Sequence, residues 1–252
     1  MKTFRLIFLA GLVFTLASCS ELSKLANSTL SNRPLTSEEI VAGLKQALQV
    51  GSDSSVVRLS KVNGYFGDAM VKILLPPEAN VITQNLSKLP GGENLVNEVI
   101  LRINRAAEDA AKEAGPIFLG AITSMTIPDG LAILKGNETA ATTYLKTNTS
   151  QQLFQLYQPK IKVSLEKKLI GNVSTADSWK KLTTEWNKVA NSTVGVLAGL
   201  KPVNVNLETY LTQKGLDGMF LKIGEEEKKI RTDVRARVTD LLKRVFGSQP
   251  QS

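Results

Sequence analysis

The sequence predicts an all-α fold, with a single multi-helix domain preceded by a lipoprotein signal peptide and a short tether. Three observations predict this fold class. Apolar residues recur at intervals of three and four over most of the chain, as they do on the buried face of a helix. Proline and glycine interrupt these stretches at positions typical of helix ends. Strict alternation of apolar and polar residues is nowhere long enough to predict a sheet.

Residues 1–18 have the layout of a secretory signal peptide. Lys2 and Arg5 supply a positive start, and an apolar run follows from Leu6 to Leu16 before small residues. This run of about 11 residues is well short of the roughly 20 that a membrane-spanning helix needs. We therefore expect a cleaved signal rather than a transmembrane anchor.

Cys19 is the only cysteine in the chain and directly follows this signal. The residues "LASC", from Leu16 to Cys19, resemble the lipobox of bacterial lipoproteins, in which the cysteine sulfur is lipidated and the new amino terminus is acylated. A lone cysteine cannot form an internal disulfide, so lipidation is favoured over a free thiol. Several acyl chains would hold the protein firmly on a membrane of the cell envelope. By resemblance to lipoprotein sorting, Ser20 in place of Asp favours the outer membrane.

The rest of the chain divides into three parts. Residues 19–34 are mostly small and polar, and we interpret them as the lipidated cysteine and a flexible tether. The helical domain is expected at residues 35–247, and a disordered tail at residues 248–252.

The first domain helix begins at a capping box formed by Thr36 and Glu39. The motif "VGS" at residues 50–52 predicts its end, and a second helix then carries Val56 to Leu59. Further helices follow between proline and glycine signals. They are expected after Pro76 and Pro77, from Leu95 to Ala110, from Pro116 through Ile122, and from the turn "MTIPDG" to Gly136.

The second half of the domain continues the helical pattern. Residues from Tyr144 to Tyr157 are interpreted as the core of a helical pair, and Val194 to Leu200, "VGVLAGL", as an apolar loop. The C-terminal helix is predicted to bury one apolar face and to stop at Gly247. That face consists of Val234, Val238, Leu241, Leu242 and Val245.

The charge of the chain suits anionic partners. The full chain has 31 basic and 23 acidic residues, and the signal removes two basic ones, which leaves a net charge of +6. Behind a lipoprotein signal such partners would be lipid headgroups, an anionic polymer or an envelope protein, rather than nucleic acid. Solubility alone explains the same charge, because the basic residues are spread along the chain.

The chain contains no histidine, and after lipidation it has no free thiol. Catalysis by Ser-His-Asp or Cys-His arrangements and the usual zinc sites are therefore excluded. Carboxylate chemistry, lysine chemistry and oxygen-only metal binding remain open. We predict no metal site and no cofactor.

Several stretches resemble one bacterial protein family. They are "NRAAEDAAKEAGPIFLGAITSMTIPDGLAILKGNETAATTYLK" at residues 104–146, "LDGMFLKIGEEEKKIR" at 216–231 and "LLKRVFG" at 241–247, together with "EEIVAGLKQAL" in the first helix. In wording and order they are similar to the family named domain of unknown function 4197. This resemblance implies an envelope-associated, mainly helical protein, and it implies no activity.

The densest charge cluster is "EEEKKIR", residues 225–231. Glu225 with Lys229, and Glu227 with Arg231, have the i, i+4 spacing of helical ion pairs, which is typical of a solvated helix face. The alternative is a docking face for an acidic or anionic partner. Its candidate residues are Glu226, Arg231, Arg235, Arg237, Lys243 and Arg244.

Other candidate residues have plausible structural roles. Asp129 fits the start of a helix, and Asn104, Arg105 and Glu108 lie on a helix whose other face is apolar, where Arg105 is expected to pair with Asp109.

Trp179 and Trp186 would suit a sugar-stacking platform, but their spacing with Leu182 and Val189 favours the core.

The leading function is a non-enzymatic, membrane-anchored envelope lipoprotein that binds or scaffolds a partner. One alternative is a carboxylate-dependent hydrolase of cell-wall glycans, which needs two carboxylates in one cleft. A second is a carrier of a lipid or other apolar ligand, which needs a large apolar cavity between helices. The carboxylates to compare are Glu108, Asp129, Asp217 and Glu226.

Overall fold

The computed structural model describes residues 33–86 and 90–249. Within these ranges there are ten α-helices and two short 3-10 helices, and the β-type pairing consists of one isolated bridge between Ile170 and Val173. The all-α prediction is therefore confirmed. The signal peptide, Cys19, the tether up to residue 32 and the last three residues of the tail lie outside the described residues.

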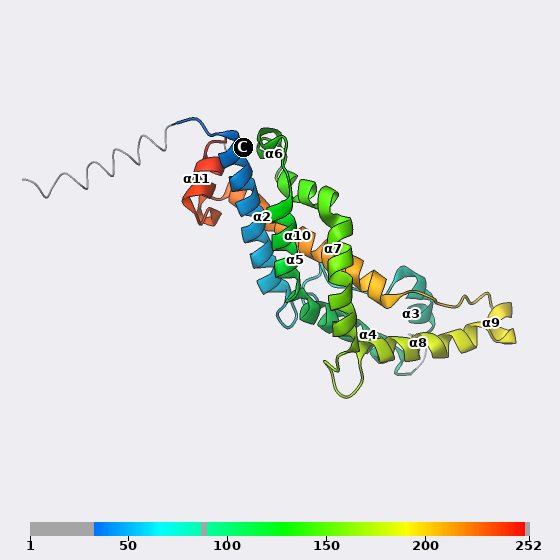
Figure 1. Cartoon of the computed structure of the whole chain (residues 1–252). Coiled ribbons are helices and arrows are strands. Elements are labelled where there is room, and N and C mark those ends of the chain that lie inside the picture. Colours follow the sequence, from blue (N-terminus) through cyan, green and yellow to red (C-terminus); the bar gives the residue numbers. More distant parts are fainter. Residues whose placement is uncertain (1–32, 87–89, 250–252) are drawn as a thin grey trace, which may run out of the picture.

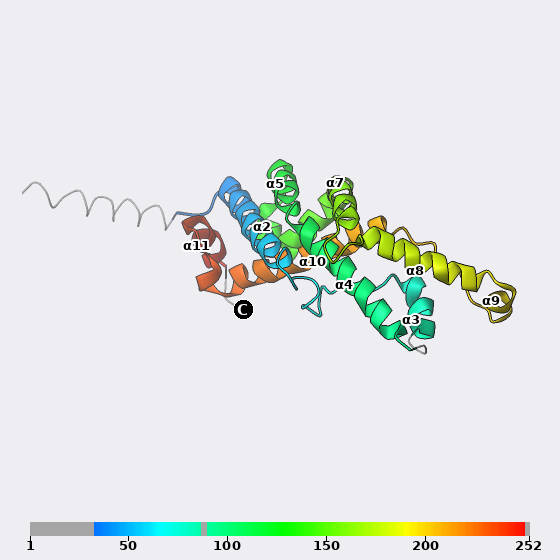
Figure 2. The ribbon, with the colours of Figure 1, turned by 90° about the horizontal axis from the view of Figure 1, so that it is seen from below.

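Four long or central helices form the body of the domain. Helices α2 (Ser37–Leu59), α5 (Ala114–Ser124) and α7 (Ala140–Glu166) form one layer, and α10 (Leu207–Thr232) runs across it (Figures 1 and 2). Helix α10 packs most extensively against α2 and α7. The core is therefore built mainly where α10 crosses its two neighbours.

Helix α2 is continuous, so the predicted stop at residues 50–52 is wrong. The capping box of Thr36 and Glu39 is present at its start. Gly51 does not end the helix because α10 crosses there, and a Cβ atom on Gly51 would lie only 3.3 Å from Ile223. The glycine serves close packing of two helices instead of a turn.

Helix α7 is also a single helix, which corrects the predicted helical pair. Pro159 lies inside it and removes one backbone hydrogen bond. Tyr157 and Ile161, on either side of the proline, are fully buried. Burial of these large side chains holds the helix together across the proline.

A second group of helices extends away from the body. It contains η1 (Pro77–Ala79), α3 (Asn80–Leu86), α4 (Gly92–Ala111), α8 (Thr175–Ala190) and α9 (Thr193–Leu197). Helix α9 lies at one end of the elongated molecule, and α11 (Asp240–Gly247) lies beside the start of α2 at the other (Figures 1 and 2). The predicted apolar loop at Val194 is thus a short helix, whose first turn is capped by Ser192.

The C-terminal helix is shorter than predicted. A 3-10 turn, η2 (Val234–Ala236), comes first, and Val234 and Val238 are 53% and 66% exposed. The helical structure is interrupted at Arg237. The Arg237 guanidinium donates to the carbonyl oxygens of Ile230 and Arg231 at the end of α10. These bonds satisfy carbonyl groups that a helix end leaves unpaired, so they outweigh continuation of the helix. Among the predicted apolar face, Leu242 and Val245 are buried.

The remaining short helix, α6 (Gly130–Leu134), begins as predicted, because the Asp129 carboxylate accepts a hydrogen bond from the Ala132 amide at 2.9 Å. None of the helices in the described ranges has the length and apolar character required to cross a membrane.

Candidate functional site

A lateral groove of about 640 Å³ lies between α3, α4 and α8. This volume is within the range of roughly 300–1,000 Å³ that is usual for sites of small ligands. Its floor is apolar and its edge carries the charged residues Glu98, Arg102, Lys181 and Glu185. The apolar lining consists of Ile82, Leu86, Leu95, Val99, Val173, Leu182, Trp186, Val189 and Leu200.

The amphipathic pattern of α4 and α8 explains the floor of this groove. Val99 on α4, with Leu182 and Trp186 on α8, are less than 8% exposed. Leu95 and Val189 line the same groove but remain 46% and 53% exposed. Exposed apolar surface of this kind is typical of a groove that binds a further apolar molecule.

Arg102 fixes one side of the groove. Its side chain is only 9% exposed, and it donates to Glu98 on the same helix. It also donates to the carbonyl oxygens of Ile170 and Val173, at 2.7 and 2.9 Å, in the loop that leads to α8. Arg102 therefore holds α4 and this loop together, and its donors are occupied by the protein itself.

The opposite side is fixed by α8 and the segment that returns from α9. The Trp186 indole N–H donates to the Lys201 carbonyl at 2.9 Å. The Asn187 side chain accepts from the Val203 amide at 2.7 Å and donates to the Val203 carbonyl at 3.0 Å. The Trp179 indole N–H donates to the Val205 carbonyl. The tryptophans are thus core residues that brace the groove, as their spacing predicts.

Lys181 differs from the other charged residues at the edge. Glu98 pairs with Arg102, and Glu185 pairs with Lys188. Lys181 is exposed and forms no ion pair with any of the residues that the structure describes. It is therefore a cation available to an anionic group bound at the groove.

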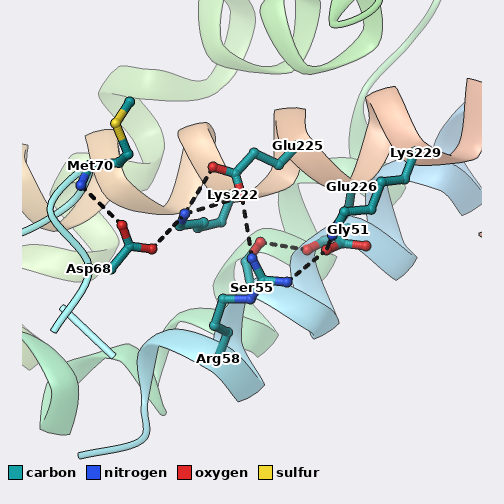
Figure 3. A network of polar contacts seen from close by, with 9 residues as sticks. All are labelled: Gly51, Ser55, Arg58, Asp68, Met70, Lys222, Glu225, Glu226 and Lys229. Atoms are coloured by element: carbon teal, nitrogen blue, oxygen red, sulfur yellow. Dashed lines mark hydrogen bonds and ion pairs between the residues drawn. The ribbon is translucent and has the colours of Figure 1, made fainter. Parts of the chain in front are cut away.

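The charge cluster of α10 forms an ion-pair network with α2 and the loop that follows it (Figure 3). Lys222 is 4% exposed, and its ammonium lies 2.7 Å from Asp68 and 2.9 Å from Glu225. Arg58 of α2 bridges Glu225 and Glu226. Sequence reasoning missed Lys222 because its partner Asp68 is distant in the chain.

These contacts change the acid–base behaviour of Lys222 and Asp68. Burial by itself lowers the pKa of Lys222, but the hydrogen bonds to Asp68 and Glu225 raise that pKa above its ordinary value. The hydrogen bond from Lys222 lowers the pKa of Asp68. Both groups are therefore held in their charged forms.

The predicted ion pairs of residues 225–231 are only partly present. Glu227 does pair with Arg231, at 2.7 Å, but both side chains are buried instead of forming a solvated face. Lys229 pairs with Glu226 and not with Glu225, because Glu225 is engaged by Lys222 and Arg58.

The candidate docking face is divided by the fold. Arg237 is buried and the Arg231 side chain is only 10% exposed, so neither presents its charge on an exposed face. Arg235 pairs with Asp233 and Lys243 with Asp240, both as exposed pairs. The two remaining candidates also have partners: Glu226 contacts Arg58 and Lys229, and Arg244 contacts Glu39 of α2. Docking of a partner on the exposed members remains a prediction.

The four carboxylates considered for hydrolysis are engaged in separate contacts. The Glu108 carboxylate is buried and accepts hydrogen bonds from the Tyr65 and Phe66 amides. Asp129 caps α6, and Asp217 pairs with Lys146. Neither the lateral groove nor the smaller cavity near the start of α2 is lined by Glu108, Asp129, Asp217 or Glu226.

The other candidates on α4 hold the preceding loop in place. The Asn104 side chain is fully buried, accepts from the Ile73 amide and donates to the Ile73 carbonyl. Arg105 pairs with Glu108, so the expected pair with Asp109 is wrong. Asp109 instead contacts Lys112 and Lys167. Within the described ranges, no group of three or more acidic side chains is placed to hold a metal ion.

The fold and the groove define a class of protein: an all-α domain with an apolar groove braced by partly buried hydrogen bonds. A family model described as "Protein of unknown function (DUF4197)" matches residues 34–247, so the chain belongs to this family. Comparisons with curated proteins and with solved structures found no match.

Proposed function

We propose that this protein is a membrane-anchored lipoprotein of the cell envelope that binds the alkyl chain of an anionic amphipathic molecule in the lateral groove. The proposal that the protein binds such a molecule is supported by the residues that line the groove. The groove offers an apolar lining and, among the residues that the structure describes there, one cation without an ion-pair partner, Lys181. An alkyl chain would cover the lining, and an acidic end group would meet the lysine.

The contribution of the lining follows from its apolar character. Burial of a methylene group stabilises a complex by about 0.8 kcal/mol. Lys181 is solvent-exposed, so it would select the charge of the ligand more than it would add affinity. No covalent step is needed for this function, and we propose a binding module rather than an enzyme.

The anchor is supported by the resemblance of residues 16–19 to a lipobox and by the position of Cys19 after an apolar run. The domain begins at residue 35, so a tether of only about 15 residues would keep it close to the membrane. A carrier or receptor of lipid-like molecules would then lie next to the membrane that supplies these molecules. Ser20 favours the outer membrane as the site of attachment.

The anchor is tested with Cys19→Ala in the full chain. We expect the wild type in the membrane fraction with radiolabelled palmitate incorporated, and the variant unlabelled and either soluble or unprocessed. A wild-type chain that is processed and soluble would overturn the lipoprotein part of the proposal.

The groove is tested by titration with cis-parinaric acid, a fluorescent fatty acid. Val189→Trp places a bulky side chain across the groove, at a position that is 53% exposed and so tolerates substitution. We expect the dissociation constant to rise by about tenfold or more, which corresponds to the loss of roughly two buried methylene groups.

Val163→Trp is the matched control, because Val163 is also a 53% exposed valine but lies on α7 outside the groove. It should bind as the wild type does.

Lys181→Gln should weaken binding of the fatty acid but not of the corresponding alcohol. Equal affinity of the Val189→Trp and Val163→Trp variants would show that the groove is not the binding site.

A further inference from the structure

The most exposed apolar residues of the described chain lie on α9. Leu197 is 83% exposed, more than any other large apolar side chain there, and Val194 and Val196 are 76% and 64% exposed. We call these three side chains the α9 tip. Scattered exposed apolar residues are ordinary, but three on one short helix form a patch that calls for a partner.

The tip is a defined structure and stands at the end of an arm. Its main packing partner is α8, and it lies at the end of the molecule opposite α11 and the start of α2 (Figures 1 and 2). Gly195 lets α9 fold back tightly, since a Cβ atom there would lie 2.1 Å from the Val189 carbonyl oxygen. The Leu200 amide donates to the Gly195 carbonyl at 2.9 Å and closes the turn. The apolar side chains are therefore presented outward by a tightly closed turn.

The charged residues in the segment that carries the tip are basic. Residues 186–207 contain two lysines, Lys188 and Lys201, and no acidic residue. Lys188 contacts Glu185 in an exposed pair, and Lys201 forms no ion pair within the described residues. Lys201 directly follows Leu200, so its charge stands beside the tip. A partner surface that combines an apolar interior with anionic groups complements this arrangement.

The size and shape of the tip decide between a protein and a lipid partner. A stable protein interface buries roughly 800 Å² on each partner. Three side chains at the end of a narrow arm supply only a small part of that area. Shallow insertion, about 5–10 Å deep at the boundary between headgroups and acyl chains, requires no such area.

We infer that the α9 tip inserts into the surface of a lipid bilayer that carries anionic headgroups, with Lys188 and Lys201 at headgroup level. Val189 and Leu200 flank the tip and also line the lateral groove. Insertion would therefore place one end of the groove at the membrane surface. The inference stands on the tip alone and does not depend on what the groove binds.

The test is a local fluorescence measurement on the full chain. Cys19→Ser is combined with Val196→Cys, and the single thiol is labelled with the environment-sensitive dye NBD. Vesicles of phosphatidylcholine, with or without phosphatidylglycerol, are then added. We expect a blue-shifted emission, and quenching by bromine-labelled acyl chains, with vesicles that contain phosphatidylglycerol.

The matched control is Val62→Cys in the same background. Val62 is 75% exposed and lies after α2, away from α9 in the chain. The emission of the dye at residue 62 should be that of a water-exposed dye with every vesicle. This should hold even if the N-terminal residues attach the chain to the membrane. Replacement of Lys188 and Lys201 by Glu should reduce insertion of the tip by more than about fivefold per lysine removed.

Three results would overturn the inference. The dye at residue 196 could stay in water with all vesicles, or it could insert equally with and without phosphatidylglycerol, which would contradict the choice of an anionic surface. A blue shift that appears without vesicles and grows with protein concentration would assign the tip to a second copy of the chain. A positive result is independent of fatty-acid binding in the groove, so either proposal can fail alone.

Discussion

The Glu227 carboxylate and the Arg231 guanidinium lie 2.7 Å apart on α10 and are both almost entirely buried. The carboxylate also accepts hydrogen bonds from the Ala141 and Thr142 amides at the start of α7. The guanidinium donates to the Leu134 carbonyl at the end of α6. One ion pair therefore satisfies backbone groups that the ends of two other helices leave unpaired, and it ties these helix ends to α10.

Glu227→Ala is expected to lower the free energy of unfolding by about 3–5 kcal/mol, because it leaves a buried guanidinium and two amide groups without their acceptor. Urea unfolding monitored by circular dichroism measures this loss. Glu226→Ala is the control, since Glu226 is the neighbouring acid and forms partly exposed pairs worth only about 0–1 kcal/mol. Similar losses of unfolding free energy in the two variants would contradict a structural role for the buried pair of Glu227 and Arg231.

Leu242→Ala should destabilise the protein by about 2–5 kcal/mol, the usual range for a core leucine, because Leu242 is fully buried where α11 packs on α2. Leu241→Ala should cost clearly less, because Leu241 is only partly buried. Chemical unfolding of both variants provides the comparison. A larger loss for Leu241 would mean that α11 presents a different face to the domain.

Arg237→Ala should be much more harmful than Arg235→Ala, although both remove one positive charge. Arg237 is 4% exposed and donates to two carbonyl groups at the end of α10, and each unsatisfied group costs roughly 1–3 kcal/mol. The Arg235 side chain is 91% exposed and pairs only with Asp233. Thermal unfolding distinguishes them, and equal midpoints would contradict the capping role of Arg237.

Gly218→Ala should destabilise the protein by about 1–3 kcal/mol, the usual cost of overpacking. The new Cβ atom would lie 2.7 Å from the buried Tyr65 ring, whose hydroxyl is fixed by a hydrogen bond to the Gly215 carbonyl. Gly120→Ala, in α5, meets nothing within 4 Å and should stabilise by up to about 1 kcal/mol. Opposite signs in a denaturant titration are the expected result, and two stabilised variants would show that Tyr65 can move aside.

The contribution of Asp68 to stability should depend on pH. Its pKa is lowered from 3.8 by the hydrogen bond from Lys222, so its contribution is complete above that value and is lost as the pH falls through the lower folded pKa. The difference in unfolding free energy between the wild type and Asp68→Asn should therefore be constant near about pH 7 and should shrink as the pH falls below about 3.8. A difference that does not change with pH would mean that the pair with Lys222 contributes nothing.

Much of the helical architecture could be predicted from local signals. The capping box at Thr36, the cap at Asp129 and the proline before η1 are each read from a few adjacent residues. The predictions that are wrong concern places where distant packing overrides a local signal. Gly51 is predicted to end a helix, but it lies within α2 where this helix packs against α10.

The candidate site was less predictable than the fold. An apolar cavity between helices could be named as the requirement for a carrier, but its position depends on how α3, α4 and α8 meet. The periodicity of α8 predicts that Leu182, Trp186 and Val189 all face inward, but Val189 is 53% exposed. Leu95, on the apolar stripe of α4, is likewise 46% exposed. Exposure of an apolar residue is a property of the packed molecule.

The sequence by itself determined the helical class and several helix starts, and it predicts lipidation of Cys19, because these depend on residues close together in the chain. Only the tertiary structure decided which charges are buried. Glu225, Glu226 and Glu227 are chemically identical and adjacent. Glu227 is nevertheless fully buried in a pair with Arg231, whereas Glu225 and Glu226 pair with Arg58 on another helix. The physical reason is that the free energy of a charge depends on its solvent and its partners, and both are set by elements that are distant in sequence.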